Sequence, residues 1–389
     1  MSLTAGVPPR DRLEQVGLLA LLGIVAAMQL SIAVTQILLA VAAICWLASH
    51  VASGDRLEAP AFFWPLVAYA GLTLLSAGFA HEPGVSFTDC KQLVLLILVP
   101  IVYDLARGAR ARSVLSIILT VGAVSALVGI VQYGVLNYDN LGRRAQGTLS
   151  HWMTYSGTLM LVICGAVARL LYGTSGRLWA ALIMPALLAA LMVSITRSAW
   201  VGVGVGVGTL LLSKDFRLVA VIPIAVAVVM TLAPGVVTDR AQSIFNLNDP
   251  TTRDRVAMLQ AGVAIVRDYP LTGVGPDQIA LVYPRYRVPG AVNPTNPHLH
   301  NVPMQIAAER GLPALAAWVW FVVSAITGLL GLLRRSRHRS LAAAGLGAMA
   351  AMLAAGMFEY NFGDSEFQML LLVLVTLPFA ANRDGGLPA

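Results

Sequence analysis

The sequence predicts an all-α polytopic membrane protein with about twelve transmembrane helices and one large outer loop that contains an amphipathic helix. Composition is the first reason, because 58% of the 389 residues are hydrophobic and 12% are charged, whereas a soluble domain carries roughly 25% charged residues. The second reason is that apolar runs of about 20 residues, long enough to cross a bilayer, recur along the whole chain. The third is the distribution of charge among the connections.

The apolar runs predict a single integral membrane domain over residues 1–389. Its twelve spans are expected at residues 14–30, 32–50, 61–80, 90–107, 113–134, 152–173, 178–196, 199–213, 217–233, 303–333, 341–359 and 366–382. No convincing small-residue cleavage site accompanies the first run, so we expect a retained span and not a removed signal peptide. The three cysteines, Cys45, Cys90 and Cys164, match no metal spacing, and no disulfide framework is expected.

Loop charge predicts the orientation of the chain. Residues 107–112 and 334–339 are rich in arginine, whereas residues 80–89 and 359–366 are acidic or nearly free of cations. Loops that carry many arginines and lysines stay on the cytoplasmic side. The bias therefore predicts an even number of spans with both termini in the cytoplasm.

Some arginines lie on the outer side, against this orientation rule. In Thr196-Arg197-Ser198, Arg197 joins two apolar runs with almost no loop, so its guanidinium lies at or within the membrane edge. Ionisable groups there cost several kcal/mol and usually mark a ligand or a pathway. Two interpretations stay open for Arg197: a contact with a bound anion, or an interfacial arginine that extends to water.

The one long loop, residues 234–302, contains a predicted helix. Apolar residues recur at helical spacing between Arg253 and Asp268, namely Val256, Leu259, Val263 and Val266. Thr251 and Thr252 offer capping hydroxyls, and an amphipathic outer helix fits best. Tyr269-Pro270 ends it, and Gly273-Val-Gly-Pro276 forms the turn that follows. Residues 234–302 are thus expected to be a structured periplasmic loop.

Arg255 lies beside the apolar face of this predicted helix. It either points towards the membrane-embedded part of the protein or forms a rim salt bridge with Asp254 or Asp268. A second, shorter outer loop precedes His151 and carries the double arginine Arg143-Arg144 together with Gln146. We expect this loop to line the same cavity.

Four glycines in one predicted span indicate close helix packing. Gly202, Gly204, Gly206 and Gly208 form two overlapping small-xxx-small pairs, which let neighbouring helices approach one another. The alternative is a helix that is thinned to make room for a lipid chain.

Residues 293–302 are a polar stretch in an otherwise mostly apolar chain. They contain two histidines and three asparagines and lead through Glu309-Arg310-Gly311 into an apolar helix. Histidine, with an unperturbed pKa near 6.5, can take a proton from a hydroxyl at neutral pH. Arginine forks match phosphate oxygens in two-point contacts. Together they indicate a group transfer in which arginines hold a departing lipid-linked phosphate or diphosphate and histidine activates the accepting hydroxyl.

A zinc site is the alternative interpretation of the histidines. His298 and His300 could bind zinc together with Glu309, Asp277 or His151. Loop spacing alone is weak support, and the sequence contains no His-Glu-x-x-His pattern. We therefore expect neither a metal nor another cofactor.

Three groups of residues in the second half resemble the O-antigen ligase and polymerase superfamily of bacterial envelopes. They are Ser194-Ile-Thr-Arg-Ser-Ala-Trp-Val-Gly202, Arg255 ahead of Tyr269-Pro-Leu-Thr-Gly-Val-Gly275, and His300-Asn301 followed after nine positions by Gly311. The last is the most specific, because O-antigen ligases carry His, then Asn, Ser or Gln, nine free positions, and Gly-x-x with a final Gly, Thr or Tyr. Ala314 departs from the pattern at that final position. The resemblance covers roughly residues 190–320, and the first half mainly by its pattern of spans.

The resemblance implies a glycosyltransferase that moves a finished glycan from undecaprenyl diphosphate to a lipid A-core sugar. The site would face the periplasm at the inner membrane of a Gram-negative bacterium, and the transfer would be inverting and independent of metal. His300 would be the general base, and Arg197 and Arg255 would bind the diphosphate. Further substrate-binding residues are expected to be Arg143, Arg144, Gln146, Arg253, His298 and Asn301. The expected partners are the two substrates and membrane lipids, with no nucleic acid, and the oligomeric state is left open.

Three other functions stay open. Within the superfamily these are an O-antigen polymerase and a protein O-glycosyltransferase. The compact length, the single large outer loop and the His-Asn-x9-Gly spacing favour the ligase, because polymerases tend to show two substantial arginine-bearing outer loops. From another class comes a lipid or solute transporter, which often shows inverted repeats and helices broken at midplane. The sequence contains neither an internal repeat nor a matching pair of interrupted spans.

Overall fold

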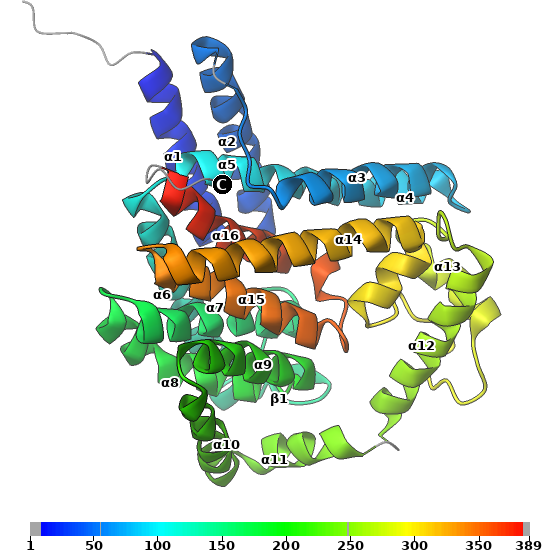
Figure 1. Ribbon diagram of the computed structural model, residues 1–389. Coiled ribbons are helices and arrows are strands. Elements are labelled where there is room, and N and C mark those ends of the chain that lie inside the picture. Colours follow the sequence, from blue (N-terminus) through cyan, green and yellow to red (C-terminus); the bar gives the residue numbers. More distant parts are fainter. Residues whose placement is uncertain (1–8, 55, 247–248, 384–389) are drawn as a thin grey trace, which may run out of the picture.

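The apolar runs of the sequence form helices in the computed structural model of the protein (Figure 1), which describes residues 9–54, 56–246 and 249–383. The polar residues 1–8 ahead of the first predicted span, and residues 247–248 of the predicted loop, lie outside the described residues. Apart from one two-stranded hairpin, the regular elements of the described residues are helices. The prediction of an all-α protein is thus confirmed.

Between residues 9 and 214, the described part of the chain forms ten helical elements and the hairpin. The helices are α1 (Pro9–Ala27), α2 (Ile32–Ser53), α3 (Phe63–Gly78), α4 (Pro83–Asp89), η1 (Cys90–Ile97), α5 (Leu98–Leu105), α6 (Ala109–Gly134), α7 (Trp152–Tyr172), α8 (Arg177–Val193) and α9 (Arg197–Lys214). Strands β1 (Asp139–Asn140) and β2 (Arg143–Arg144) pair antiparallel, with Asp139 opposite Arg144.

The described residues from 216 onward add ten further helical elements. They are η2 (Phe216–Ala220), α10 (Val221–Leu232), α11 (Gly235–Gln242), η3 (Ser243–Phe245), α12 (Pro250–Asp268), α13 (Ile279–Tyr286), α14 (Val302–Arg335), α15 (Arg339–Ala355), η4 (Asn361–Gly363) and α16 (Ser365–Asn382).

All twelve predicted spans fall on helices, and part of this set has the length and apolarity to cross a bilayer. Within the described residues six segments qualify, namely α2, residues 83–105, α6, α7, α14 and α16. Four apolar helical segments are shorter, namely α3, α8, residues 216–228 and α15. The chain is a multi-pass membrane protein, and the number of twelve crossings stays a prediction.

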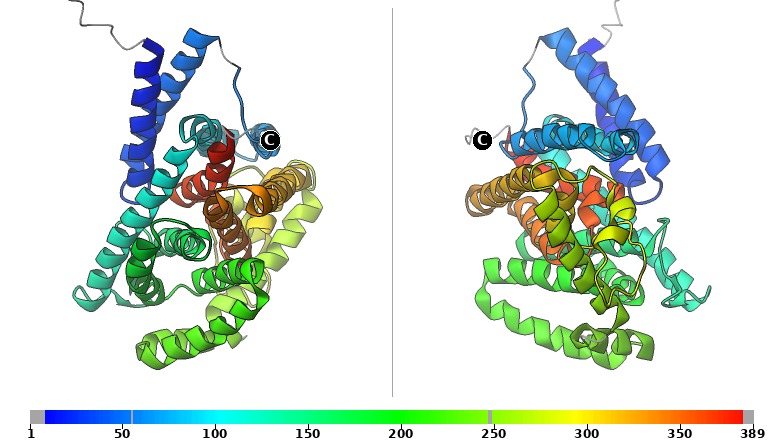
Figure 2. Two further views of the ribbon diagram at one scale, coloured as in Figure 1. Left: turned by 60° about the vertical axis from the view of Figure 1, so that its left-hand side comes forward. Right: turned by 90° about the vertical axis from the view of Figure 1, so that its right-hand side faces the viewer.

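The helices pack into one bundle from which α1 and α2 project as a pair (Figures 1 and 2). Helix α3 runs beside α14, and α15 lies against α7, α9 and α14. A Cβ atom at Gly202 would lie 2.1 Å from the Met160 sulfur, and one at Gly206 would lie 2.7 Å from the Cys164 sulfur. Packing is therefore the role of this glycine pair, whereas a Cβ at Gly204 would meet open space.

The segment from α10 to α13 leaves the bundle after α9, arcs around one end of it and returns at the start of α14 (Figure 1). Its main element is α12, the predicted amphipathic helix. Asp249 caps this helix by accepting hydrogen bonds from the backbone amides of Thr251 and Thr252 at 3.1 and 3.3 Å. The expected capping by the threonine hydroxyls was therefore wrong, and Pro250 occupies the first helical position instead.

The buried face of α12 also differs from the predicted one. Val256 and Val263 are 50% and 41% exposed, and the buried face consists of Asp254, Ala257, Met258, Ala261, Gly262 and Ile265. Small residues allow the close approach, since a Cβ atom at Gly262 would lie 2.5 Å from Met304 Cγ on α14.

Helix α14 has a kink at Gly311, whose φ is 80°. The turn after α12 lies against this kink: the amide of Val274 donates to Ala308 O at 3.0 Å, and that of Gly275 to Glu309 O at 2.9 Å. A Cβ atom at Gly311 would lie 2.1 Å from Leu271 O. The kink therefore joins the turn after α12 to the bundle.

Candidate active site

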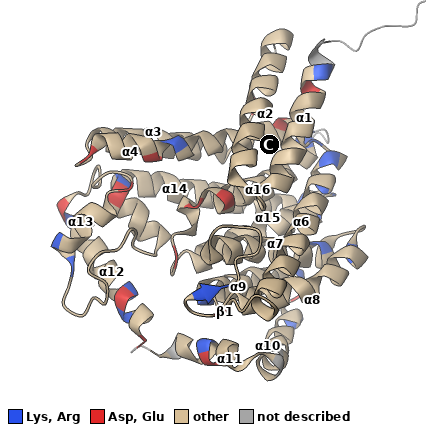
Figure 3. Cartoon of the chain, turned by 180° about the vertical axis from the view of Figure 1, so that it is seen from behind, with Lys and Arg blue, Asp and Glu red and all other residues tan. Residues whose placement is uncertain are grey.

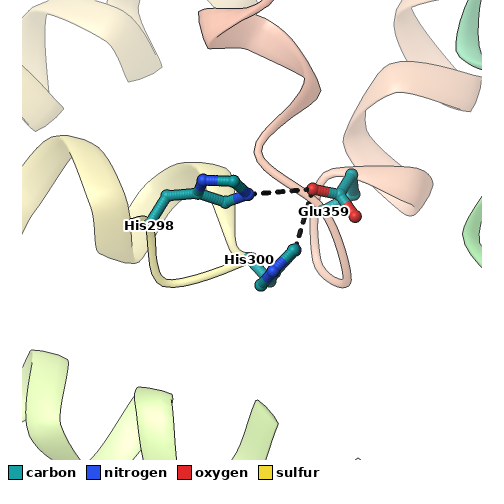
Figure 4. A group of neighbouring side chains, drawn as sticks. All are labelled: His298, His300 and Glu359. Carbon is teal, nitrogen blue, oxygen red and sulfur yellow. Dashed lines mark hydrogen bonds and ion pairs between the residues drawn. The ribbon is translucent and has the colours of Figure 1, made fainter. Parts of the chain in front are cut away.

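Two histidines and a glutamate meet where the polar stretch reaches the bundle (Figure 4). His300 Nδ1 lies 2.8 Å from Glu359 Oε1, and His298 Nε2 lies 3.5 Å from the same oxygen. The two imidazole centroids are 4.2 Å apart. The histidines come from the segment before α14 and Glu359 from the connection between α15 and α16, so one carboxylate oxygen holds both rings.

The backbone around His300 is fixed by caps and a strained torsion. His300 has a φ of 49°, in the left-handed region that non-glycine residues seldom adopt and that often marks functional sites. The next residue, Asn301, caps α14 by accepting a hydrogen bond from the Met304 amide at 2.9 Å, and it donates to Met357 O at 3.0 Å. The second of these bonds ties the residue next to His300 to the segment that carries Glu359.

Glu359 is 8% exposed and carries a negative charge at neutral pH. Burial alone would raise the pKa of Glu359. Hydrogen bonds from His298 and His300 lower it by a larger amount, so the net pKa is well below the ordinary value. Because Glu359 is an acceptor, the geometry assigns the proton of a neutral His300 to Nδ1. Nε2 of His300 is then able to accept a proton.

Arg197 and Arg255 lie beside His300 in a cavity of about 180 Å³, here called the cationic pocket. Its lining includes no carboxylate, and its apolar residues are Val201, Ile244, Val256, Leu259, Leu299, Met357 and Phe358. Arg255 Nη2 lies 3.8 Å from Glu359 Oε2. Arg255 thus points into the bundle, and the rim salt bridge with Asp254 or Asp268 was the wrong alternative.

Arg197 begins α9 and is 7% exposed. Its Nη1 donates to Ser243 O at 2.9 Å, and its Nη2 donates to Asp249 Oδ1 at 3.1 Å. Arg197 is therefore held against the arc from α10 to α13 and does not extend from the membrane edge to water.

Two further arginines add positive charge to this region. Burial and then the charges of Arg240, Arg197 and Arg255 lower the pKa of Arg144 to about 10, so the Arg144 guanidinium is still charged at pH 7. Asp249 pairs with Arg197 and, at 3.7 Å, with Arg240. The carboxylates that pair with these four guanidiniums are Asp249 and Glu359. The surplus of positive charge suits a polyvalent anion such as a diphosphate.

A second cavity, of about 300 Å³ and here called the acidic pocket, reaches the cluster from the side of His298. Five carboxylates line it, from Asp89, Asp277, Glu309, Glu359 and Asp364. Its one arginine, Arg310, contacts Glu309, Asp89 and the Tyr360 hydroxyl. His151 also lines it, and burial lowers the pKa of this imidazole. The two pockets therefore differ in charge and share the histidine–glutamate cluster.

The other predicted site residues lie at different distances from this centre. Arg143 and Arg253 are exposed and line neither pocket, and Arg143 stacks over Tyr138. The backbone amide of Gln146 donates to Gln132 Oε1 at 2.9 Å. The amide group of Asn301 is engaged in the cap of α14. A substrate contact of these four residues stays a prediction.

His298, His300 and Glu359 could also offer ligand atoms to a metal ion. Their donor atoms lie within 4.8 Å of one another, and they form the one group of this kind in the part of the chain that the structure describes. The group differs from the predicted one, because Glu359 takes the place of Glu309, Asp277 or His151. A metal ion would replace the hydrogen bond between His300 and Glu359.

Three residues of the site, Glu359, Asp249 and Arg240, were not predicted from the sequence. The sequence does contain an indication of Glu359, because this residue begins the acidic connection 359–366, which also predicts the orientation of the chain. No local pattern indicates Asp249 or Arg240, since their contacts depend on how the arc folds back onto α9.

Residues 180–319 match the family model described as O-antigen ligase. The matched range includes Arg197, Arg255 and His300 and ends before Glu359. The chain has no significant similarity to a curated protein. The family resemblance predicted from the sequence motifs is confirmed by this match.

Proposed function

We propose that this chain, whose residues 180–319 match the O-antigen ligase family model, transfers a finished glycan from undecaprenyl diphosphate to a hydroxyl of a lipid A-core sugar. The reaction takes place at the periplasmic face of a Gram-negative inner membrane. The observation that supports this most is the position of Arg197, Arg255 and His300 around one cationic pocket. A phosphate-binding group and a base are thereby brought to the same place.

Arg197 and Arg255 bind the diphosphate of the donor. Two guanidinium forks can each make two-point contacts with phosphate oxygens, and Arg144 and Arg240 increase the positive potential around them. Val201, Val256 and Leu259, on the wall of the same pocket, suit the first isoprenyl units of the lipid. When the bond to the sugar breaks, these arginines stabilise the charge that develops on the leaving diphosphate.

His300 acts as the general base on the acceptor. Its Nδ1 proton is held by Glu359, and Nε2 takes the proton of the accepting hydroxyl as the hydroxyl oxygen attacks the anomeric carbon. The bond from that carbon to the diphosphate oxygen breaks, and the diphosphate leaves with the bonding electrons. One displacement on the side opposite the leaving group inverts the anomeric configuration. The Glu359 carboxylate stabilises the imidazolium that results.

The test uses purified protein reconstituted in lipid vesicles with lipid-linked glycan and purified lipid A-core. Glycan is expected on lipid A, and lengthening of the lipid-linked chain without lipid A product would instead identify a polymerase. His300→Ala is expected to lower the transfer rate by about 100-fold to 10,000-fold, whereas the matched control His338→Ala, in the connection before α15, keeps it. Transfer near the wild-type rate in His300→Ala and in the double variant with His298→Ala would overturn the proposed role.

A further inference from the structure

We propose that the acidic pocket binds the acceptor sugar, and that it selects an uncharged sugar over a phosphorylated or carboxylated one. This inference rests on the proposed function, which requires two substrates to reach one base. It assigns a site to the second substrate, and it assigns to the pocket carboxylates the choice of its chemical class.

The position of the two pockets is the first argument. His300 lines the cationic pocket, and His298 and Glu359 line the acidic pocket. The imidazole centroids are 4.2 Å apart, so the pockets meet at the histidine pair. If the donor diphosphate occupies the cationic pocket, the acidic pocket is the remaining approach to the same base.

Charge is the second argument. The carboxylates of the acidic pocket outnumber its cations, and its single arginine, Arg310, is already in contact with Glu309 and Asp89. A phosphate or carboxylate on the entering sugar would therefore be repelled. Sugar hydroxyls are hydrogen-bond donors, and ionised carboxylates accept strongly from such groups. The lining thus suits an uncharged polyol.

Buried polar atoms without partners provide the third, independent argument. Asn361 lines the acidic pocket, is 8% exposed, and its Oδ1 has no hydrogen-bond partner. Glu359 Oε2 likewise makes no hydrogen bond, although Arg255 Nη2 lies 3.8 Å from it. A buried acceptor that lacks a partner costs about 1–3 kcal/mol. A hydroxyl donor from a sugar would satisfy either atom and so recover part of this cost.

The backbone beside the pocket is consistent with a preformed site. Asp277 has a φ of 59° and donates its amide to Glu309 Oε1 at 3.0 Å. Strained torsions of this kind persist where the surrounding structure holds them, often at ligand sites. The volume of about 300 Å³ lies at the lower end of the range for small-ligand pockets, so it fits a terminal sugar better than a long oligosaccharide.

A binding experiment without donor tests the inference separately from transfer. A soluble core oligosaccharide with an uncharged terminal sugar is titrated into detergent-purified protein, and its dissociation constant is compared with that of the same oligosaccharide phosphorylated on that sugar. The wild type is expected to bind the uncharged form at least tenfold more tightly. Asn361→Ala is expected to weaken that binding about tenfold, and Asp277→Asn to reduce the difference between the two forms. The matched control Asp239→Asn, on the exposed side of α11, leaves both constants unchanged.

Kinetics complete the test. In reconstituted protein, Asn361→Ala is expected to raise KM for the acceptor and to leave KM for the donor unchanged. Equal or tighter binding of the phosphorylated oligosaccharide by the wild type would overturn the inference, as would an acceptor KM that does not respond. A rise in the donor KM alone would assign the pocket to the donor and also overturn it. Expected binding without any glycan transfer would contradict the proposed function and leave the sugar site in place.

Discussion

At the scale of single residues, the shape of the arginine side chain is as important as its charge. Arg197 and Arg255 share the cationic pocket with His300, and a lysine ammonium cannot reproduce a two-point contact with phosphate. Arg197→Lys and Arg255→Lys are each expected to lower the transfer rate by about 100-fold to 1,000-fold. The measurement is the initial rate of glycan transfer at saturating acceptor.

Arg267→Lys is the matched control for these substitutions, because Arg267 is exposed in the last turn of α12. Its rate is expected to equal that of the wild type. If Arg255→Lys also kept the wild-type rate, two-point binding of phosphate by this residue would be refuted.

Glu359 gives a second prediction at this scale. Glu359→Gln replaces the carboxylate that accepts the Nδ1 proton of His300 with an amide that can also donate. The favoured tautomer and the stabilised imidazolium are then lost, and kcat is expected to fall by between about 100-fold and 10,000-fold. KM for the donor is expected to change little, because the arginines are kept. A fall in donor affinity with kcat unchanged would contradict the positioning role.

The lowered pKa of Glu359 also predicts how stability depends on pH. Its folded-state pKa lies below the ordinary glutamate value of about 4.3. The charged form therefore stabilises the folded protein above about pH 4.3, and this contribution is lost as the pH falls towards the lower folded pKa. The thermal midpoint of the wild type is expected to fall more steeply below about pH 4.3 than that of Glu359→Gln. Parallel curves for the two proteins would argue against the lowered pKa.

At the scale of elements, the kink of α14 connects the arc to the bundle. The φ of Gly311 is 80°, and an alanine there would place Cβ 2.1 Å from Leu271 O. Gly311→Ala is expected to cost about 1–3 kcal/mol and to lower the thermal midpoint of the detergent-solubilised protein. Gly331→Ala, later in the same helix and with open space around its Cβ position, is the matched control. An equal midpoint for both variants would show that the kink tolerates a side chain.

The same elements show how far the sequence predicts this structure. Hydrophobic periodicity was enough to find α12, because a 3.6-residue repeat survives in any packing. It did not find the buried face, because this face includes small residues such as Gly262, where a Cβ atom would lie 2.5 Å from Met304 Cγ on α14. Tertiary contacts of this kind are not encoded in the local pattern.

The residues of the candidate site were likewise predicted only in part. Arg197, Arg255 and His300 were predicted, because an arginine at a membrane edge and a histidine in an apolar chain are chemically unusual within their own segments. Glu359 is 59 residues from His300 and lies in an acidic connection that is common on an outer face. Its importance depends on the distance of 2.8 Å to His300, which only the folded chain provides.

At the scale of the whole molecule, the cationic pocket is lined by residues of η3 and α12 and by the first turns of α9. Figure 1 shows the arc that contains η3 and α12 at one end of the bundle. Many charged residues of the described chain lie on the arc, the β1–β2 hairpin and the helix ends (Figure 3). In the orientation predicted from loop charge, the arc faces the periplasm and the connection between α7 and α8 faces the cytoplasm. A lipid-linked donor could then enter the cationic pocket from the outer leaflet.

Labelling of single cysteines tests this orientation. Thr295 lies in the segment before α14 and Ser175 in the connection between α7 and α8, and both are exposed. In a background with Cys45, Cys90 and Cys164 replaced by serine, Thr295→Cys is expected to react with a membrane-impermeant maleimide in spheroplasts. Ser175→Cys is expected to react only after the membrane is opened, because the negative intracellular face retains the arginine-rich connections. Reaction of Ser175→Cys in intact spheroplasts, with Thr295→Cys protected, would reverse the orientation and place the active site in the cytoplasm.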